Sequence, residues 1–273
     1  MVPNFEILNP VLQAALAGLF TWLLTLLGAA AVFLKRDIPR PVLDFLLGLA
    51  AGIMVAASFW SLLAPGIAAA EHQGLTAWAV AALGFLSGAA FLWIMDKTIP
   101  HLHPGLDPDK AEGPASNLRE STLLFLVMMI HNIPEGLAVG IGFGAAAGGI
   151  DFPLGIGLSG AIALSLGIGL QNLPEGLAVA LPMRRAGLSR WKCFLLGQGS
   201  ALVEPLAAVA GAALVLAMAP ILPWALCFAA GAMIYVVIEE LLPEAQKEGR
   251  YDSVTLAVIL GFTVMMVLDV ALG

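Results

Sequence analysis

A nine-residue motif that combines a carboxylate with amide or imidazole side chains occurs twice in this chain. Residues 131–139 read HNIPEGLAV and residues 171–179 read QNLPEGLAV, so seven of the nine positions are identical. On a helix, positions i, i+1 and i+4 fall within an arc of about 100°. Each copy is therefore predicted to present three polar side chains on one helix face: His131, Asn132 and Glu135 in the first, and Gln171, Asn172 and Glu175 in the second.

Prolines beside the glutamates predict an opening in the helix backbone at this point. Pro134 and Pro174 each lack a backbone N–H and crowd the preceding turn. The carbonyl groups of Ile130 and Leu170 should thereby be released as further oxygen ligands. A third Glu–Pro pair begins at Glu204, in the sequence GSALVEPLA. We therefore expect three carboxylates, one imidazole and several amides to converge.

This set of side chains is typical of a cation site. The apolar segments around the carboxylates contain no Lys or Arg, so only protons or bound cations remain to balance their charge. Imidazole nitrogen with carboxylate and amide oxygen suits Zn²⁺, Fe²⁺, Mn²⁺, Co²⁺, Ni²⁺ and Cd²⁺, whereas an all-oxygen cage would favour Ca²⁺ or Mg²⁺. A lone His or Asn in an apolar helix often serves only in packing, but the duplicated set favours a site. The pattern has room for two ions, with Glu135 and Glu175 bridging between them.

The elements that carry these residues are predicted to be membrane-spanning helices of one transmembrane domain, residues 1–273. The chain is 60% hydrophobic and 11% charged, which is less than half the charge that a soluble domain carries, so its outer surface must face lipid. About 20 apolar residues suffice to span a bilayer. Eight such spans are predicted, at about 8–34, 42–64, 75–98, 121–147, 153–182, 191–219, 222–243 and 252–272.

The basic residues predict the topology. All twelve Lys and Arg residues fall in, or at the ends of, the connections after the first, third, fifth and seventh spans. By the positive-inside rule, these connections are cytoplasmic and both termini lie outside. The one long polar connection, about 99–120, is then a cytoplasmic loop. The net charge of −7 disfavours nucleic acid as a partner. The expected partners are membrane lipid and divalent metal ions.

At the two motifs the sequence resembles the ZIP (Zrt/Irt-like) family of metal transporters, in its short-looped bacterial form. The resemblance rests on HNIPEG in the fourth span and NLPEG in the fifth, and it extends over nearly the whole chain. It implies an all-α 3+2+3 bundle, in which spans 1–3 and 6–8 are related by inverted symmetry around spans 4 and 5. It also implies a transporter without enzymatic activity that moves zinc toward the cytoplasm across a plasma or bacterial inner membrane, with cadmium, iron and manganese as further candidate substrates.

The resemblance further implies a binuclear site. One ion would be held by His131, Glu135, Gln171 and Glu175, and the second by Asn132, Glu135, Asn172, Glu175 and Glu204. Many family members carry His where this chain has Gln171, and some carry Asp where it has Asn172. Both departures weaken the contribution of the second copy, which leaves occupancy of the second ion open and favours broad selectivity.

Weaker likenesses extend toward the two membrane faces. Five residues resemble a family exit site at the cytoplasmic end: Asp96, His101, His103, Glu239 and Glu240. Three others match positions near the outward entrance: Met54, Ser61 and Asp269. A solvated loop explains the two histidines equally well, and ordinary core packing explains Met54. Homodimerisation is implied too, with the Gly- and Ala-rich third span as the interface.

Three other functions are alternatives to a carrier. A passive cation channel or a membrane metal sensor could use the same residues. An intramembrane protease is suggested superficially by GLSG at 157–160. Its Ser159 would need a histidine from a later helix, but all four histidines precede it, and the zinc-protease pattern HExxH is absent from the sequence.

Overall fold

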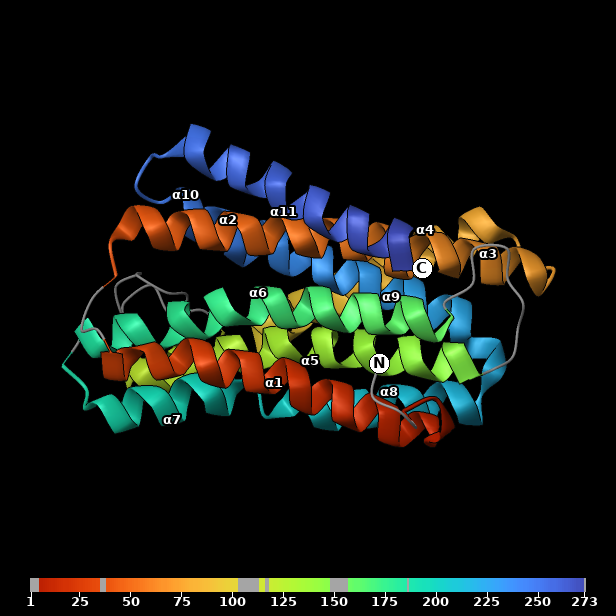
Figure 1. Cartoon of the computed structure of the whole chain (residues 1–273), viewed down its shortest axis with the longest axis horizontal. Coiled ribbons are helices and arrows are strands. Elements are labelled where there is room, and N and C mark those ends of the chain that lie inside the picture. The colour runs from red at the N-terminus through yellow and green to blue at the C-terminus, as the bar shows by residue number, and fades with distance from the viewer. Residues whose placement is uncertain are drawn as a thin grey trace.

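The computed structural model describes residues 5–34, 38–102, 113–115, 118–147, 157–185 and 187–272, and every regular element within them is helical (Figure 1). The α-helices are α1 (Pro10–Leu34), α2 (Arg40–Ala57), α3 (Ala64–His72), α4 (Ala77–Thr98), α5 (Glu120–Ala147), α6 (Leu158–Arg185), α7 (Arg190–Ser200), α8 (Val203–Ala217), α9 (Leu222–Val236), α10 (Leu242–Gln246) and α11 (Tyr251–Leu272). Short helical turns are η1 (Phe5–Ile7), η2 (Ser58–Leu63), η4 (Ala219–Ile221) and η5 (Val237–Leu241).

Within the described residues, eight helical stretches are long and apolar enough to cross a membrane, which confirms the predicted number. Five are the single helices α1, α4, α5, α6 and α11. The other three are composite: α2–η2–α3, α7–α8 and η4–α9–η5–α10. Parts of the predicted loop 99–120 and the predicted start of the fifth span at 153 lie outside the described residues.

Two spans are longer than the sequence predicted, because prolines do not end them. The second was expected to stop at residue 64 and the seventh at 243, but they continue to His72 and Gln246. In each, a π-helical turn (η2 or η5) precedes the proline, which then occupies the first turn of the next helix segment. The helix is continuous there, and the wider π-helical turn accommodates a residue that donates no backbone hydrogen bond.

The two helices that carry the repeated motif lie at the centre of the bundle (Figure 1). In the most apolar window of each span, 72% of α5 and 78% of α6 is buried, against 22% of α4 and 28% of α11. The outer helices therefore present mostly apolar side chains to lipid, and polar groups on α5 and α6 are enclosed by protein. That enclosure makes intramembrane carboxylates tolerable.

Helix pairing follows an inverted repeat. The most extensive contacts are made by α5 with α8, α2 with α11, α1 with α6, and α4 with α9. Exchanging the first three spans with the last three, and α5 with α6, converts the pair α5–α8 into α6–α1. The same exchange converts the pair α2–α11 into α9–α4. The equivalent spans are five apart in the chain and so run in opposite directions. The predicted 3+2+3 arrangement is thus confirmed by the packing.

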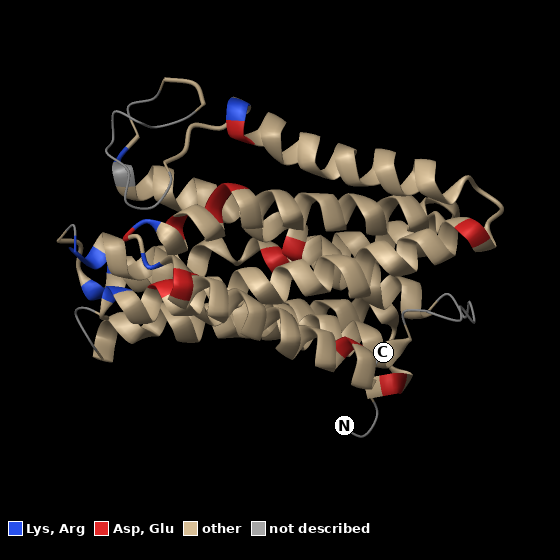
Figure 2. Ribbon diagram, turned by 90° about the horizontal axis from the view of Figure 1, so that it is seen from above, with Lys and Arg blue, Asp and Glu red and all other residues tan. Residues whose placement is uncertain are grey.

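Charged residues separate along the long axis of the bundle. Figure 2 shows Lys and Arg gathered toward one end, which we call the basic end, while acidic residues also occur in the middle. At the basic end, the buried Asp44 of α2 accepts hydrogen bonds from Arg40 (2.5 Å) and Arg250 (2.9 Å). Arg40 also contacts Glu244 at 2.7 Å. This group ties α2 to α10 and to the start of α11.

Candidate metal site

The structure brings the central predicted residues together in the interior of the bundle. They lie on three neighbouring helices, α5, α6 and α8, and each side chain is at most 4% exposed: His131, Asn132, Glu135, Gln171, Asn172, Glu175 and Glu204. The helical spacing of each motif copy places its three polar groups toward the same interior region. Figure 2 shows acidic residues in the middle of the bundle, away from the basic end.

Hydrogen bonds connect the second motif copy to α8 and α1. The Asn172 side-chain amide donates to Glu204 Oε2 at 2.8 Å and to the carbonyl oxygen of Thr21 at 3.3 Å. Gln171 Nε2 donates to Asn172 Oδ1 at 3.3 Å. These bonds orient Asn172 and fix one oxygen of Glu204, while the other oxygen stays available.

The three carboxylates are close enough to repel one another. Glu135 interacts electrostatically with Glu175 and Glu204, and it also lies beside Gln171. Glu175 in turn interacts with Glu240 of η5. The described Lys and Arg residues lie toward the basic end (Figure 2). Negative charge is therefore concentrated where water is excluded, and a cation or protons must balance it.

Several oxygen atoms of the cluster are buried without a hydrogen-bond partner among the described residues: Asn132 Oδ1, both carboxylate oxygens of Glu135, Gln171 Oε1 and Glu204 Oε1. An unsatisfied buried polar atom costs about 1–3 kcal/mol. Such a cost in five atoms of one region is typical of a site built for a ligand. All five are acceptors with free lone pairs, so the chemistry of the group fits a metal cation.

The predicted breaks at the motif prolines are wrong. Helices α5 and α6 run without interruption through Pro134 and Pro174. Each proline removes one backbone hydrogen bond, and tight packing of both helices against their neighbours holds the rest of the turn. Ligation by the carbonyl groups of Ile130 and Leu170 stays a prediction.

The glycine that follows each motif glutamate has a role that the sequence analysis missed. A Cβ atom on Gly136 would lie 2.4 Å from the carbonyl oxygen of Glu204, and one on Gly176 would lie 2.2 Å from that of Thr25. Only glycine lets α8 approach α5, and α1 approach α6, this closely. The repeated PEG sequence was the available signal, but the partner helix can be known only from the fold.

The described conformation does not contain a ready-made cage. Among the residues that the structure places, no three His, Cys, Asp or Glu side chains are grouped tightly enough to hold an ion. The ligands proposed below include Asn and Gln oxygens, and they belong to three separate helices. Binding therefore requires their side chains to close in on the ion.

Toward the basic end, part of the predicted exit group is assembled. The buried Asp96 accepts a hydrogen bond from Tyr235 at 2.5 Å, and His101 Nε2 lies 3.8 Å from Asp96 Oδ1. Tyr235 also interacts with Glu239. Tyr235 was missed because a tyrosine within an apolar span carries no distinctive pattern. His103 lies outside the described residues.

Glu240 is buried on η5 and interacts electrostatically with Glu175 of the central cluster, and its role in an exit site stays a prediction. At the opposite end, Ser61 donates a hydrogen bond to Asp269 at 2.6 Å, and the second carboxylate oxygen of Asp269 is buried without a hydrogen-bond partner among the described residues. Met54 is fully buried within the apolar core, as the packing interpretation expected.

Eight apolar spans around a buried carboxylate cluster define a polytopic α-helical membrane protein of the transporter type. The chain belongs to the ZIP family: the family model described as "ZIP Zinc transporter" matches residues 8–122 and 107–269.

Relatives from animals and bacteria match over nearly the full length. The chain is 41% identical to human "Zinc transporter ZIP11", over 97% of this chain and 98% of that protein. It is 38% identical to "Zinc transporter ZIPB" of Bordetella bronchiseptica, over 95% and 81%. Identity to "Zinc transporter GufA" of Myxococcus xanthus is 36%, over 94% and 98%.

Proposed function

We propose that this protein carries divalent transition-metal ions across a membrane toward the cytoplasm, with zinc as the principal substrate and cadmium, iron and manganese as further candidates. The observation that carries the proposal is the carboxylate cluster of Glu135, Glu175 and Glu204, buried in the middle of the bundle with unsatisfied oxygens. The names of the relatives, all zinc transporters, support zinc as the cargo.

Two ions can be accommodated in the proposed site. The first is assigned to His131, Glu135, Gln171 and Glu175, and the second to Asn132, Glu135, Asn172, Glu175 and Glu204. Glu135 and Glu175 then serve both ions. The electrostatic interactions that Glu135 makes with Glu175 and Glu204 support this assignment, because a shared carboxylate must lie near both groups of ligands.

A carrier is favoured over a channel or a sensor by the enclosure of the site. All seven ligand side chains are almost fully buried. An ion held by several such ligands leaves slowly unless the protein changes conformation, and this requirement describes alternating access.

Uptake of metal into proteoliposomes tests the function. We expect saturable uptake of Zn²⁺ by the full-length protein and its loss in Glu135→Ala. The matched control is Glu71→Ala, which removes the same side chain from an exposed position on α3. Full uptake by Glu135→Ala would contradict the site. Metal-dependent currents without saturation would contradict the carrier and favour a channel, and tight binding without uptake would favour a sensor.

The proposed orientation places the basic end in the cytoplasm and both termini outside, in a plasma or bacterial inner membrane. The gathering of Lys and Arg at one end of the bundle supports it (Figure 2). Helix α1 begins, and α11 ends, at the opposite end (Figure 1). Labelling of a cysteine placed at Arg190 or at Glu71 by a membrane-impermeant reagent distinguishes the two faces: only the cysteine at position 71 should react from outside.

We also propose a homodimer that forms through α4. The face of α4 in contact with the second copy is a different one from the face that carries its glycines. Gly84 and Gly88 pack directly on Cys227 and Phe228 of α9, so that face of α4 is already used within the chain. The opposite face carries large exposed side chains, among them Leu83 and Leu86.

A further inference from the structure

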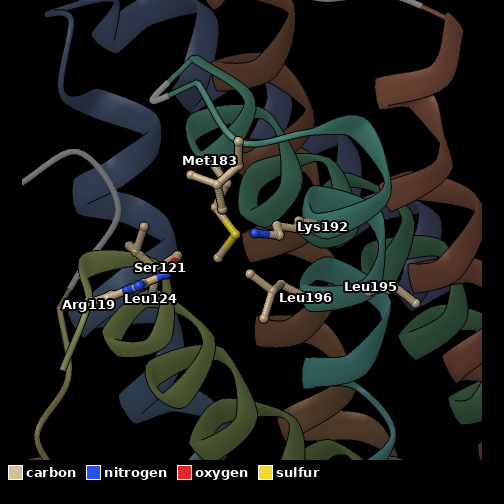
Figure 3. Close-up of a pocket in the computed structure, with 8 residues that line it drawn as sticks. Arg119, Ser121, Leu124, Met183, Lys192, Leu195 and Leu196 are labelled. Carbon is tan, nitrogen blue, oxygen red and sulfur yellow. The ribbon is translucent and has the colours of Figure 1, made fainter.

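A pocket at the basic end of the bundle is lined by none of the proposed metal ligands or exit residues. It has a volume of about 460 Å³ and lies between the start of α5, the end of α6 and the start of α7 (Figure 3). Its lining combines two cationic side chains, Arg119 and Lys192, with the hydroxyl group of Ser121. The rest of the wall is apolar and includes Met183 and Leu196.

The two cations of the pocket have no anionic partner in the described structure. Neither the guanidinium group of Arg119 nor the ammonium group of Lys192 forms an ion pair or a hydrogen bond with another described residue; the one hydrogen bond of Lys192 to a side chain comes from its backbone N–H, which donates to Ser189 Oγ. They reach the pocket from opposite walls in Figure 3, Arg119 from the residue just before α5 and Lys192 from α7. A pair of positive charges repels a divalent metal and attracts an anion, so the pocket is unsuited to the cargo.

The location of the pocket selects the kind of anion. Its walls are the end turns of the membrane-spanning helices α5, α6 and α7. Leu195, which lines it, is 55% exposed, and the adjacent Trp191 is 66% exposed. Exposed tryptophan next to exposed leucine at a helix end is typical of the boundary between acyl chains and headgroups. The pocket therefore opens where phospholipids pack against the protein.

We propose that this pocket binds an anionic phospholipid, with the phosphate of the headgroup held between Arg119 and Lys192. Ser121 can donate a further hydrogen bond to a phosphate oxygen. The part of an acyl chain nearest the headgroup would lie along Leu195 and Leu196. Basic pockets between spanning helices are suited to such headgroups, because each cation near the membrane surface attracts anionic lipid.

The bound lipid would join the three helices whose ends line the pocket. Arg184 donates to the carbonyl oxygen of Leu188 at 2.8 Å, which holds the α6–α7 connection against the pocket. A phosphate between Arg119 and Lys192 adds a bridge from α7 to the start of α5. Because this bridge would hold the helices together, we expect the lipid to stabilise the folded transporter. Two of these helices, α5 and α6, also carry proposed metal ligands.

The test compares thermal unfolding of the purified full-length protein in detergent with added phosphatidylglycerol or phosphatidylcholine. Native mass spectrometry counts the bound lipids. We expect phosphatidylglycerol alone to raise the midpoint of unfolding. Each charge removed, in Arg119→Gln or Lys192→Gln, should weaken lipid binding about fivefold, and the double variant about thirtyfold.

Two further variants separate a defined site from general surface charge. Arg190→Gln removes an exposed cation two residues from Lys192 and outside the pocket lining, so it should keep the response to phosphatidylglycerol. Leu196→Trp fills the pocket while keeping both cations, and it should abolish the response. An unchanged response in the double variant, or an equal loss in Arg190→Gln, would overturn the proposal. The same stabilisation by inorganic phosphate alone would also overturn it, since the pocket would then take a free anion.

Discussion

His131 is the single imidazole among the seven proposed ligands, so it is the residue through which a preference for zinc should act. Zn²⁺ gains more than Mn²⁺ from a nitrogen ligand. We expect His131→Ala to raise the KM for Zn²⁺ uptake by about tenfold or more, with a smaller effect on Mn²⁺. Uptake of both ions into proteoliposomes measures this, with Glu71→Ala as the control. Equal losses for the two metals would argue against ligation by nitrogen.

Gln171 occupies the position in the second motif copy that His131 occupies in the first. Gln171→His should therefore add a nitrogen ligand and shift selectivity toward Zn²⁺ relative to Mn²⁺. Competition between the two ions for uptake measures the shift. An unchanged ratio, in a variant that is folded and active, would place Gln171 outside the contact shell of the ion.

Duplication and helical spacing marked six of the seven central residues in the sequence, and a third Glu–Pro pair marked Glu204. The structure buries all seven on three neighbouring helices, while their role as metal ligands stays a prediction. The sequence was not sufficient to predict Tyr235 or the link between Glu240 and Glu175. Those contacts join helices that are distant in the chain, and only the packing of the bundle brings them together.

Between neighbouring helices, the close approach of α5 and α8 depends on Gly136. A methyl group there would meet the backbone of Glu204, which cannot move without shifting α8. We expect Gly136→Ala to lower both thermal stability and Zn²⁺ uptake. Gly142→Ala is the matched control on the same helix, since its Cβ would find only ordinary contact at 3.4 Å. Equal stability and equal uptake in Gly136→Ala and Gly142→Ala would show that the close approach of α8 to α5 does not position Glu204.

The ion-pair group at the basic end holds α2, α10 and the start of α11 together by electrostatic attraction. Asp44→Asn removes the carboxylate that both Arg40 and Arg250 contact, and it should lower the free energy of unfolding by about 2 kcal/mol. Chemical denaturation in detergent measures the change. Asp252→Asn removes an exposed carboxylate from the first turn of α11 and should have little effect. Equal stability of the two variants would contradict a structural role for Asp44.

Helix extents were predicted less well than helix identity. The second and seventh spans were predicted to end at about residues 64 and 243, yet the helices continue past Pro65 and Pro243 to His72 and Gln246. The π-helical turns before them absorb the steric conflict. A turn of this kind depends on neighbouring helices for support, so local sequence patterns do not reveal it.

For the whole molecule, the outer face of α4 determines how two copies could meet. A cysteine at Leu86, which is 63% exposed, should form an intermolecular disulfide in membranes under mild oxidation. A cysteine at Leu256 on α11, which is 65% exposed, is the matched control and should not. The native Cys193 and Cys227 are buried and contribute little background. Cross-linking at Leu256 but not Leu86 would move the interface to α11.

The inverted pairing of the helices has a chemical consequence for an ion at the centre. The inverted repeat makes α5 and α6 equivalent in the packing, but their side chains differ at one motif position. There α5 carries an imidazole and α6 carries an amide. An ion bridged by Glu135 and Glu175 would therefore sit off the pseudo-symmetry axis by an amount that depends on its identity. Nitrogen-seeking metals would be drawn toward α5, and oxygen-seeking metals toward α6. The same site would then hold different metal ions at different positions.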